Sequence, residues 1–172
     1  ALFTSREQLR VAVEALPGDL RDMVLVQTEW PRATLLARHR ERVQAGEPSV
    51  IFGMQSFGEG LDLPGELCES VFIAKLPFAP PDDPVGEARA EWLRTVGRDP
   101  FSELVVPATA IRLAQWAGRA IRTETDRAFV TCYDRRLTRT GYGKRLMQGL
   151  PPFTLVRHDA QGRAVDASAP PA

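Results

Sequence analysis

The chain has 172 residues, 44% of them hydrophobic and 26% charged, which is ample for one domain with a sizeable core. Its 22 basic and 22 acidic side chains cancel, so bulk charge does not indicate a nucleic-acid binder. Two distant cysteines exclude a disulfide framework, and no apolar run has the length of a membrane span. We therefore expect a cytoplasmic protein without a membrane segment.

Five short apolar segments predict β-strands, beginning with Leu2–Thr4. Ser5 follows directly, and we expect it to cap a helix with Gln8 in the capping-box position. The four later strands are predicted at residues 23–27, 49–53, 70–74 and 129–133. Helical patterns are expected after Ser5, after Pro31, over residues 87–96 and after Pro107.

Apolar strands that alternate with helices indicate an α/β fold, with a parallel sheet covered by helices on both faces. Ligands of such sheets bind in the loops at the carboxyl ends of the strands, so we expect the chemistry there. We predict one domain over residues 1–153 and a flexible tail over residues 154–172, where periodicity is lost. The apolar start at Ala1 favours a domain boundary inside a longer protein over removal of an initiator methionine.

The helix after Pro107 carries the first informative group of residues. Gln115, Gly118, Arg119 and Arg122 have the spacing i, i+3, i+4, i+7, which places them on one helix face. Two arginines and a glutamine one turn apart form a forked set of donors suited to phosphate. A glycine inside a helix costs about 1 kcal/mol relative to alanine, so we expect close approach there. The alternative is an exposed helix face with surface arginines.

The second group follows the third predicted strand, over residues 56–65. Three glycines and a proline indicate tight turns and close backbone approach at this strand end. Glu59 and Asp62 place two carboxylates beside those glycines. A plain glycine-rich connection is the alternative, because glycine loops are common.

Together the two groups resemble motifs of superfamily-two DNA helicases. The stretch from Gln115 to Arg122 resembles motif VI, Q-x-x-G-R-x-x-R, and Ser56–Asp62 resembles motif V of the XPD and DinG branch. Leu2–Ser5 is similar to motif IV, and further matches follow in family order to residue 153. The chain thus resembles the C-terminal motor domain of bacterial DinG-type helicases, with YoaA-like helicases as a related possibility.

This resemblance implies a RecA-like domain that works with a first motor domain of the same protein on ATP bound between them. Arg119 and Arg122 would be arginine fingers that meet the γ-phosphate, and Gln115 would organise the nucleotide or the fingers. The motif also assigns Gly118 to the nucleotide side. The family moves 5′ to 3′ along DNA.

The resemblance assigns the remaining motif residues to coupling and to DNA. Glu59, Gly60 and Asp62 would couple the nucleotide to the DNA groove. Thr4, Ser5 and Ser56 would touch the phosphate backbone of single-stranded DNA. The implied protein is a monomer that acts on the bacterial nucleoid in DNA repair.

The first half of such a motor is absent from the sequence. Gly143-Lys144 is the only Gly-Lys pair, but Thr138 stands where a phosphate-binding loop needs glycine. ATP and Mg²⁺ would therefore be held mainly by the first motor domain, which in many family members also carries an iron–sulfur cluster. No cluster or other metal site is expected in this chain, because it has only two cysteines. We expect the chain alone not to hydrolyse ATP.

Other candidate residues carry little signal. His39 lies among arginines and is expected at the surface, and His158 lies in the tail. Trp30 is a candidate for stacking on bases, whereas Trp92 and Trp116 are expected in the core or at a domain contact. Two other classes of function stay open, a nucleic-acid-binding module that has lost its motor activity and a scaffold domain with a degenerate motor fold.

Overall fold

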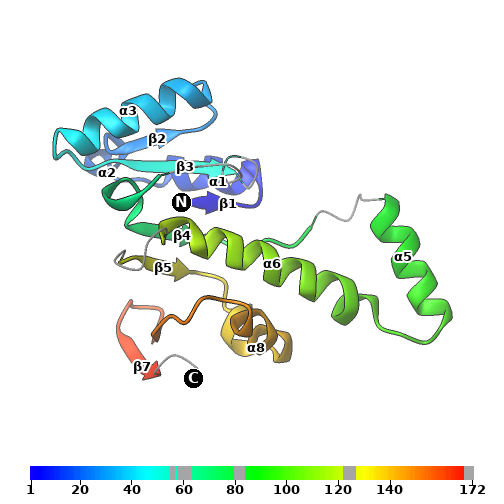
Figure 1. Cartoon of the computed structure of the whole chain (residues 1–172). Coiled ribbons are helices and arrows are strands. Elements are labelled where there is room, and N and C mark those ends of the chain that lie inside the picture. Colours follow the sequence, from blue (N-terminus) through cyan, green and yellow to red (C-terminus); the bar gives the residue numbers. More distant parts are fainter. Residues whose placement is uncertain (55–56, 58–62, 80–83, 122–126, 169–172) are drawn as a thin grey trace.

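The computed structural model of the chain describes residues 1–54, 57, 63–79, 84–121 and 127–168. Within these residues one sheet holds five parallel strands in the order β2-β3-β1-β4-β5 (Figure 1). The strands are β1 (Leu2–Phe3), β2 (Val24–Val26), β3 (Val50–Met54), β4 (Ser70–Ile73) and β5 (Phe129–Cys132). All five lie where the apolar runs predict them, and the α/β fold class is confirmed.

The helices lie between the strands of the sheet and after the last of them. They are α1 (Arg6–Glu14), α2 (Gly18–Arg21), α3 (Arg32–Gln44), α5 (Pro84–Thr95), α6 (Val106–Ala117), α7 (Arg136–Arg139) and α8 (Gly141–Gln148). Three short turns join them, η1 (Gly65–Cys68), η2 (Phe101–Val105) and η3 (Gly118–Ala120). No helix in the described part of the chain is long and apolar enough to cross a membrane.

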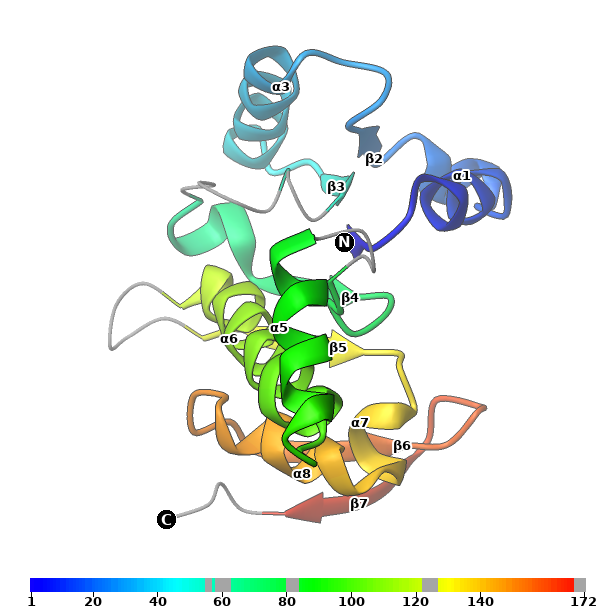
Figure 2. The same ribbon diagram turned by 90° about the vertical axis from the view of Figure 1, so that its right-hand side faces the viewer.

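The register of the sheet decides which side chains meet which helix. Leu2 pairs with Gly53 and Ile73, so these residues share a face, whereas Phe3 points to the other face. On the face of Leu2, α6 and α8 pack over β4 and β5, and α3 packs over Leu25 of β2. On the face of Phe3, α1 packs over β1, β2 and β3. Figure 2 shows α3 and α6 on one side of the strands and α1 on the other.

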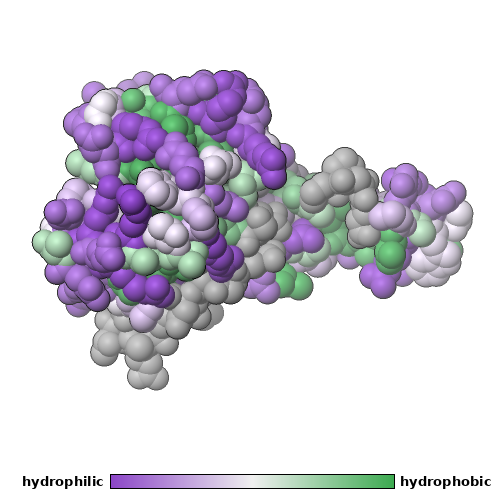
Figure 3. Space-filling view, turned by 90° about the horizontal axis from the view of Figure 1, so that it is seen from above, coloured by the Kyte–Doolittle hydropathy of each residue, from purple (hydrophilic) through white to green (hydrophobic). Residues whose placement is uncertain are grey.

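Residues between β4 and β5 form an arm that projects from the body. α5 lies away from the sheet and connects through η2, a π-helical turn, to the start of α6 (Figures 1 and 3). Leu93 of α5 is buried, but Trp92 is 59% exposed. Trp92 is therefore not in the core of this chain, and the alternative that it lies at a domain contact stays a prediction. Trp116 of α6 is 2% exposed, so its predicted core position is confirmed.

The last part of the chain is more regular than its composition predicts. β6 (Leu155–His158) and β7 (Ala164–Ser168) form an antiparallel hairpin. An isolated two-stranded hairpin is marginal in water, and in this one residues 156–158 and 164–166 are exposed. The division into a domain over 1–153 and a flexible tail over 154–172 stays a prediction.

His39 corrects the expectation of a surface residue. It is only 5% exposed, on the inner side of α3. Its Nε2 lies 2.9 Å from the carbonyl oxygen of Leu67 and its Nδ1 lies 2.8 Å from Oγ of Ser49. The carbonyl can only accept, so neutral His39 donates from Nε2 and accepts from Ser49. The arginines next to His39 in the sequence suggested a surface position. His39 is nevertheless buried, because one face of α3 packs inward while the other is exposed.

The close contact between α7 and α8 predicts a strict requirement for glycine at position 143. A Cβ atom at Gly143 would overlap the carbonyl oxygen of Leu137 and lie 2.7 Å from that of Arg136. Because backbone has to move, Gly143→Ala is expected to destabilise the protein by about 1–3 kcal/mol in urea denaturation. Gly141→Ala is the matched control in the same helix, since nothing lies within 4 Å of its Cβ position. Equal stability of the two variants would contradict this close contact.

The buried position of His39 predicts that stability falls in mild acid. Burial lowers the pKa of His39 below its ordinary value of 6.5, although the hydrogen bond to Leu67 acts in the opposite direction. The unfolded chain then binds more protons than the folded one below pH 6.5, so stability is full above that pH and falls as pH decreases. The slope reaches at most about 1.4 kcal/mol per pH unit. Urea denaturation between pH 5 and 8 (about the range in which histidine titrates) measures it, and His39→Gln should remove this part of the slope.

Candidate functional site

The motif at the end of α6 does not form one continuous helical face. α6 ends at Ala117, η3 follows over Gly118–Ala120, and Ile121 is extended with φ −122°. The predicted helix through position 122 is therefore wrong, because the chain leaves the helix at its glycine. Glycine has a low helix propensity, so an end at this position costs less than one at its neighbours.

The four motif residues differ in their surroundings. Gln115 is exposed and Arg119 is half-buried, whereas Arg122 lies outside the described residues. Nothing lies within 4 Å of the position that a Cβ of Gly118 would take. No described part of this chain therefore makes the close approach that the glycine predicted. The space over Gly118 is open, so a molecule from outside could approach the backbone there.

This motif lies at the edge where the strands begin. α6 connects β4 to β5, so it runs back along the sheet and its last turn comes near the amino end of β5 (Figure 1). η1 packs against η3 at the same edge, just before β4 starts. Gln115 and Arg119 therefore lie away from the carboxyl ends of the strands, where the fold class predicts ligand binding. Their place follows from the direction of the crossover helix.

The second motif falls mostly outside the described residues, including Ser56, Glu59, Gly60 and Asp62. Phe57 is described and is only 2% exposed. Its ring packs with Leu25 and Leu35, and the guanidinium of Arg32 lies 5.2 Å from the ring centroid. A Cβ at Gly53 would lie 2.8 Å from this ring. Phe57 therefore anchors the start of the segment in the core, a role that the sequence motif did not reveal.

Thr4 and Ser5 follow β1 at the carboxyl edge of the sheet, and both hydroxyls take part in the start of α1. Ser5 Oγ accepts a hydrogen bond of 3.2 Å from the Gln8 backbone N–H, which confirms its role as the helix cap. The Gln8 side chain instead accepts a hydrogen bond of 2.9 Å from the Thr4 hydroxyl. The full capping box is therefore not formed. The Ser5 hydroxyl proton stays available to an outside acceptor.

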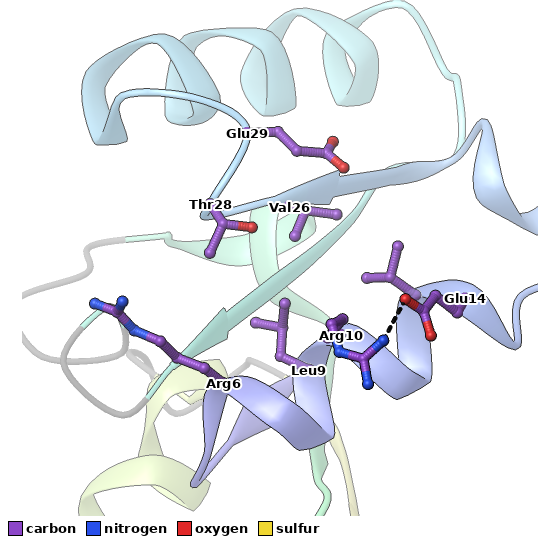
Figure 4. Close-up of a pocket in the computed structure, with 8 residues that line it drawn as sticks. Arg6, Leu9, Arg10, Glu14, Val26, Thr28 and Glu29 are labelled. Carbon is purple, nitrogen blue, oxygen red and sulfur yellow. Dashed lines mark hydrogen bonds and ion pairs between the residues drawn. The ribbon is translucent and has the colours of Figure 1, made fainter.

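A surface hollow of about 340 Å³ lies next to these residues, between α1 and the end of β2 (Figure 4). Arg6 and Thr28 stand on its two sides, and Leu9 and Val26 form its floor. Arg10 is held by Glu14 at 2.6 Å, so its charge is already compensated. The hollow thus offers the Arg6 guanidinium and the Thr28 hydroxyl, beside the Glu29 carboxylate, which pairs with Arg21 at 2.6 Å.

Asp134 is the best-connected acidic side chain at this edge, and sequence reasoning gave it no role of its own. Its Oδ2 accepts from the Leu76 backbone N–H at 3.1 Å and pairs with the Arg136 guanidinium at 2.6 Å. Burial alone would raise the pKa of Asp134, but these hydrogen bonds outweigh burial and lower the pKa. Asp134 follows β5 and Leu76 follows β4, so the carboxylate joins two neighbouring strand ends.

An aromatic cluster packs against this ion pair. The Arg136 guanidinium lies 5.0 Å from the ring centroid of Phe78. Phe78, Phe101 and Tyr142 lie with ring centroids 5.1–6.1 Å apart. The cluster therefore ties η2 and α8 to the end of β4. The three rings come from segments that are far apart in the sequence, so no local pattern indicates the cluster.

Trp30 is also held within the chain. The Arg38 guanidinium lies 3.8 Å from its ring centroid, and the ring packs against the cluster of Leu25, Leu35 and Phe57. One face of the indole is therefore already covered by a cation, which leaves less of it for stacking on a base.

Metal ligands do not converge in the described residues, where no group of three His, Cys, Asp or Glu side chains could hold an ion. The expected absence of a metal site stays a prediction. The arginine-containing turn at one edge and the hydroxyl-bearing loop at the other are the two candidate sites of the chain. The five-stranded parallel sheet with helices packed on both faces is the architecture of a RecA-like α/β domain.

Comparisons with known proteins agree with that class. A family model described as "Helicase C-terminal domain" matches residues 1–153. Three relatives are named ATP-dependent DNA helicase DinG. The one from Salmonella choleraesuis is 41% identical over 171 residues, 99% of this chain and 24% of the relative. The relative from Photobacterium profundum is 42% identical over 158 residues, which cover 90% of this chain and 23% of the relative. The relative from Escherichia coli (strain K12) is 46% identical over 137 residues, which cover 80% of this chain and 19% of the relative.

This chain belongs to the helicase C-terminal domain family, and the resemblance to DinG helicases is confirmed. It spans about a quarter or less of the length of these relatives.

The cap at Ser5 predicts different effects for two substitutions. Ser5→Ala removes the acceptor for the Gln8 N–H and should destabilise the protein by about 1 kcal/mol, whereas Ser5→Gly should cost only a few tenths. Urea denaturation of both variants measures the difference. A stability loss that is the same in both variants would show that the cap is not what Ser5 contributes.

Proposed function

We propose that this chain is the second motor domain of an ATP-dependent 5′–3′ DNA helicase. It supplies Arg119 and Arg122 as arginine fingers to ATP bound at the first motor domain of the same protein. The observation that carries the proposal is the end of α6, where Gln115 is exposed, Arg119 is half-buried and the space over Gly118 is open. The names of the DinG relatives give the reaction class, since they are ATP-dependent DNA helicases.

The chemistry at this edge is electrostatic. Phosphoryl transfer develops negative charge on the γ-phosphate and the leaving oxygen, and a guanidinium stabilises that charge with two parallel N–H donors. Packing of Trp116 and Ala120 in the core fixes the backbone on both sides of Arg119. The finger then loses little freedom when it meets the phosphate, because its backbone is already ordered. Mg²⁺ and the remaining phosphate contacts belong to the first motor domain.

The backbone at Gly118 supports a role beside the nucleotide. A side chain there would fill the space next to Gln115 and Arg119, whereas glycine lets a ribose or phosphate approach the main chain. We assign Glu59, Gly60 and Asp62 to the coupling between this site and DNA on the family motif alone. Arg122 is assigned as the second finger on the same basis.

Single-stranded DNA is assigned to the carboxyl edge of the sheet. Ser5 can donate its hydroxyl proton to a phosphate oxygen while its oxygen still accepts from Gln8. The Thr4 hydroxyl already donates to the Gln8 side chain, so it would have to break that bond to do the same. Arg6 stands beside them in the hollow of Figure 4 and adds a positive charge. Ser56 completes the motif set on the family pattern.

Other features of the longer protein follow the family and stay proposals. It would act as a monomer in the bacterial cytoplasm, with an iron–sulfur cluster, where one is present, in the first half. The sequence of this chain has neither the phosphate-binding loop nor enough cysteines for such a cluster.

ATP hydrolysis by the full-length protein tests the proposal. Arg119→Ala and Arg122→Ala should each reduce DNA-stimulated turnover by roughly a thousandfold, because each removes charge stabilisation in the transition state. Arg119→Lys should recover only part of it, since lysine keeps the charge without the fork. Gln115→Ala is expected to reduce turnover less. The measurements are steady-state ATPase with and without single-stranded DNA, together with nucleotide binding.

Arg145→Ala is the matched control, since Arg145 is an exposed arginine on α8. It should hydrolyse ATP like the wild type. The 172-residue chain alone should show no turnover, because it lacks the phosphate-binding loop. Unchanged hydrolysis in the Arg119 and Arg122 variants would mean that these arginines take no part in ATP hydrolysis. That outcome would favour a nucleic-acid-binding module. Turnover by the chain alone would contradict its assignment as half of a motor.

A further inference from the structure

On one face of the sheet, no helix of the described residues covers the half that β4 and β5 form. On β4, Val71 and Ile73 are buried on the side of α6, so Phe72 points to the opposite side. On β5, Phe129 pairs with Ser70 and Thr131 pairs with Phe72, so Phe129 lies on that same opposite side. Phe129 is 77% exposed and Phe72 is partly exposed. Phe72 and Phe129 occupy diagonal positions on neighbouring strands, so one packing element could contact both rings.

The rest of that face is covered. α1 packs over Phe3, Val24 and Val26, and its cluster extends as far as Ala74 after β4. In Figure 2, α1 lies beside the upper strands, and among the described residues no helix lies beside β4 and β5 on that side. Parallel sheets are almost always buried on both faces, because their strands are apolar on both sides. Phe129, at the start of the edge strand β5, is 77% exposed, which marks an incomplete layer on this face.

The chemistry of the open face indicates what fits it. The residues on this side of β4 and β5 are Ser70, Phe72, Phe129 and Thr131, and none of them carries a charge. A nucleic acid would need basic groups for its phosphates, so this surface does not fit DNA. The layer that covers a parallel sheet is usually helical. An apolar helix face is therefore the matching surface.

We propose that a helix of the same full-length protein, from the part outside residues 1–172, packs over Phe72 and Phe129. The relatives are long enough to contain such a helix outside the matched segment, because that segment is only 19–24% of their length. The backbone at Ala1 lies in the sheet, where its nitrogen donates to the Ile51 carbonyl oxygen at 2.6 Å. β1 is the direct neighbour of β4, so a helix joined there needs only a short connection. A short tether gives a high effective concentration, which favours this helix over a separate partner.

Photo-crosslinking in the full-length protein tests which chain covers the face. Phe129 is replaced by p-benzoylphenylalanine, and Val165 by the same residue as control, since Val165 is a strand residue that is 60% exposed. After irradiation, peptide mapping should find position 129 joined to a peptide from outside residues 1–172 of the same molecule. A crosslink between two copies would overturn the proposal in favour of a dimer. A crosslink to another protein, or none, would overturn it as well.

Thermal unfolding of the full-length protein gives an independent readout. Phe129→Asp buries a carboxylate if a helix covers the position, so the unfolding temperature of this domain should fall by roughly 4–8 °C. Val165→Asp should leave it unchanged within about 1 °C, because surface substitutions cost little. A small effect in both variants would mean that the face is open to water and would overturn the proposal.

Discussion

The direction of a crossover helix is the constraint on which the arrangement of this domain depends. Two neighbouring parallel strands, β4 and β5, can be joined only by a segment that returns along the sheet. α6 is that segment, so its first turn lies near the carboxyl edge and its last turn near the amino edge. The apolar side of α6, with Val106, Leu113 and Trp116, is the main cover of this half of the sheet. The same packing therefore builds the core and fixes where Arg119 stands.

Much of the fold could be predicted because its signals are local. Strand segments such as residues 24–26 are apolar on both faces, as a sheet with helices on both sides requires. Ser5 could be recognised as a cap because the hydroxyl and the N–H it bonds are three residues apart. His39 could not be placed, because its partners Ser49 and Leu67 are 10 and 28 residues away. Trp92 is a similar case, since a large apolar side chain predicts burial without telling whether this chain or another provides it.

The candidate site was predictable in its residue types and less so in its geometry. The order of Gln115, Gly118 and Arg119 indicates a set of donors suited to phosphate. The residues beyond Ala117, however, do not continue the regular helix that their spacing predicts. The contribution of Phe57 and Asp134 depends on contacts between segments that are far apart in the sequence. Asp134 bonds Leu76 across 58 positions. Such contacts are decided by the register of the strands, which no spacing in the sequence reports.

α6 has a mechanical consequence that goes beyond its role as a cover. Its 12 residues span about 18 Å at 1.5 Å each, roughly from one edge of the sheet to the other. A helix that is packed along its length acts as a stiff strut, because its backbone hydrogen bonds resist both stretching and compression. A displacement of η3 would therefore be transmitted along α6 to η2, where Phe101 contacts Tyr142 of α8. The two edges of this domain are connected by one helix that is packed along its length.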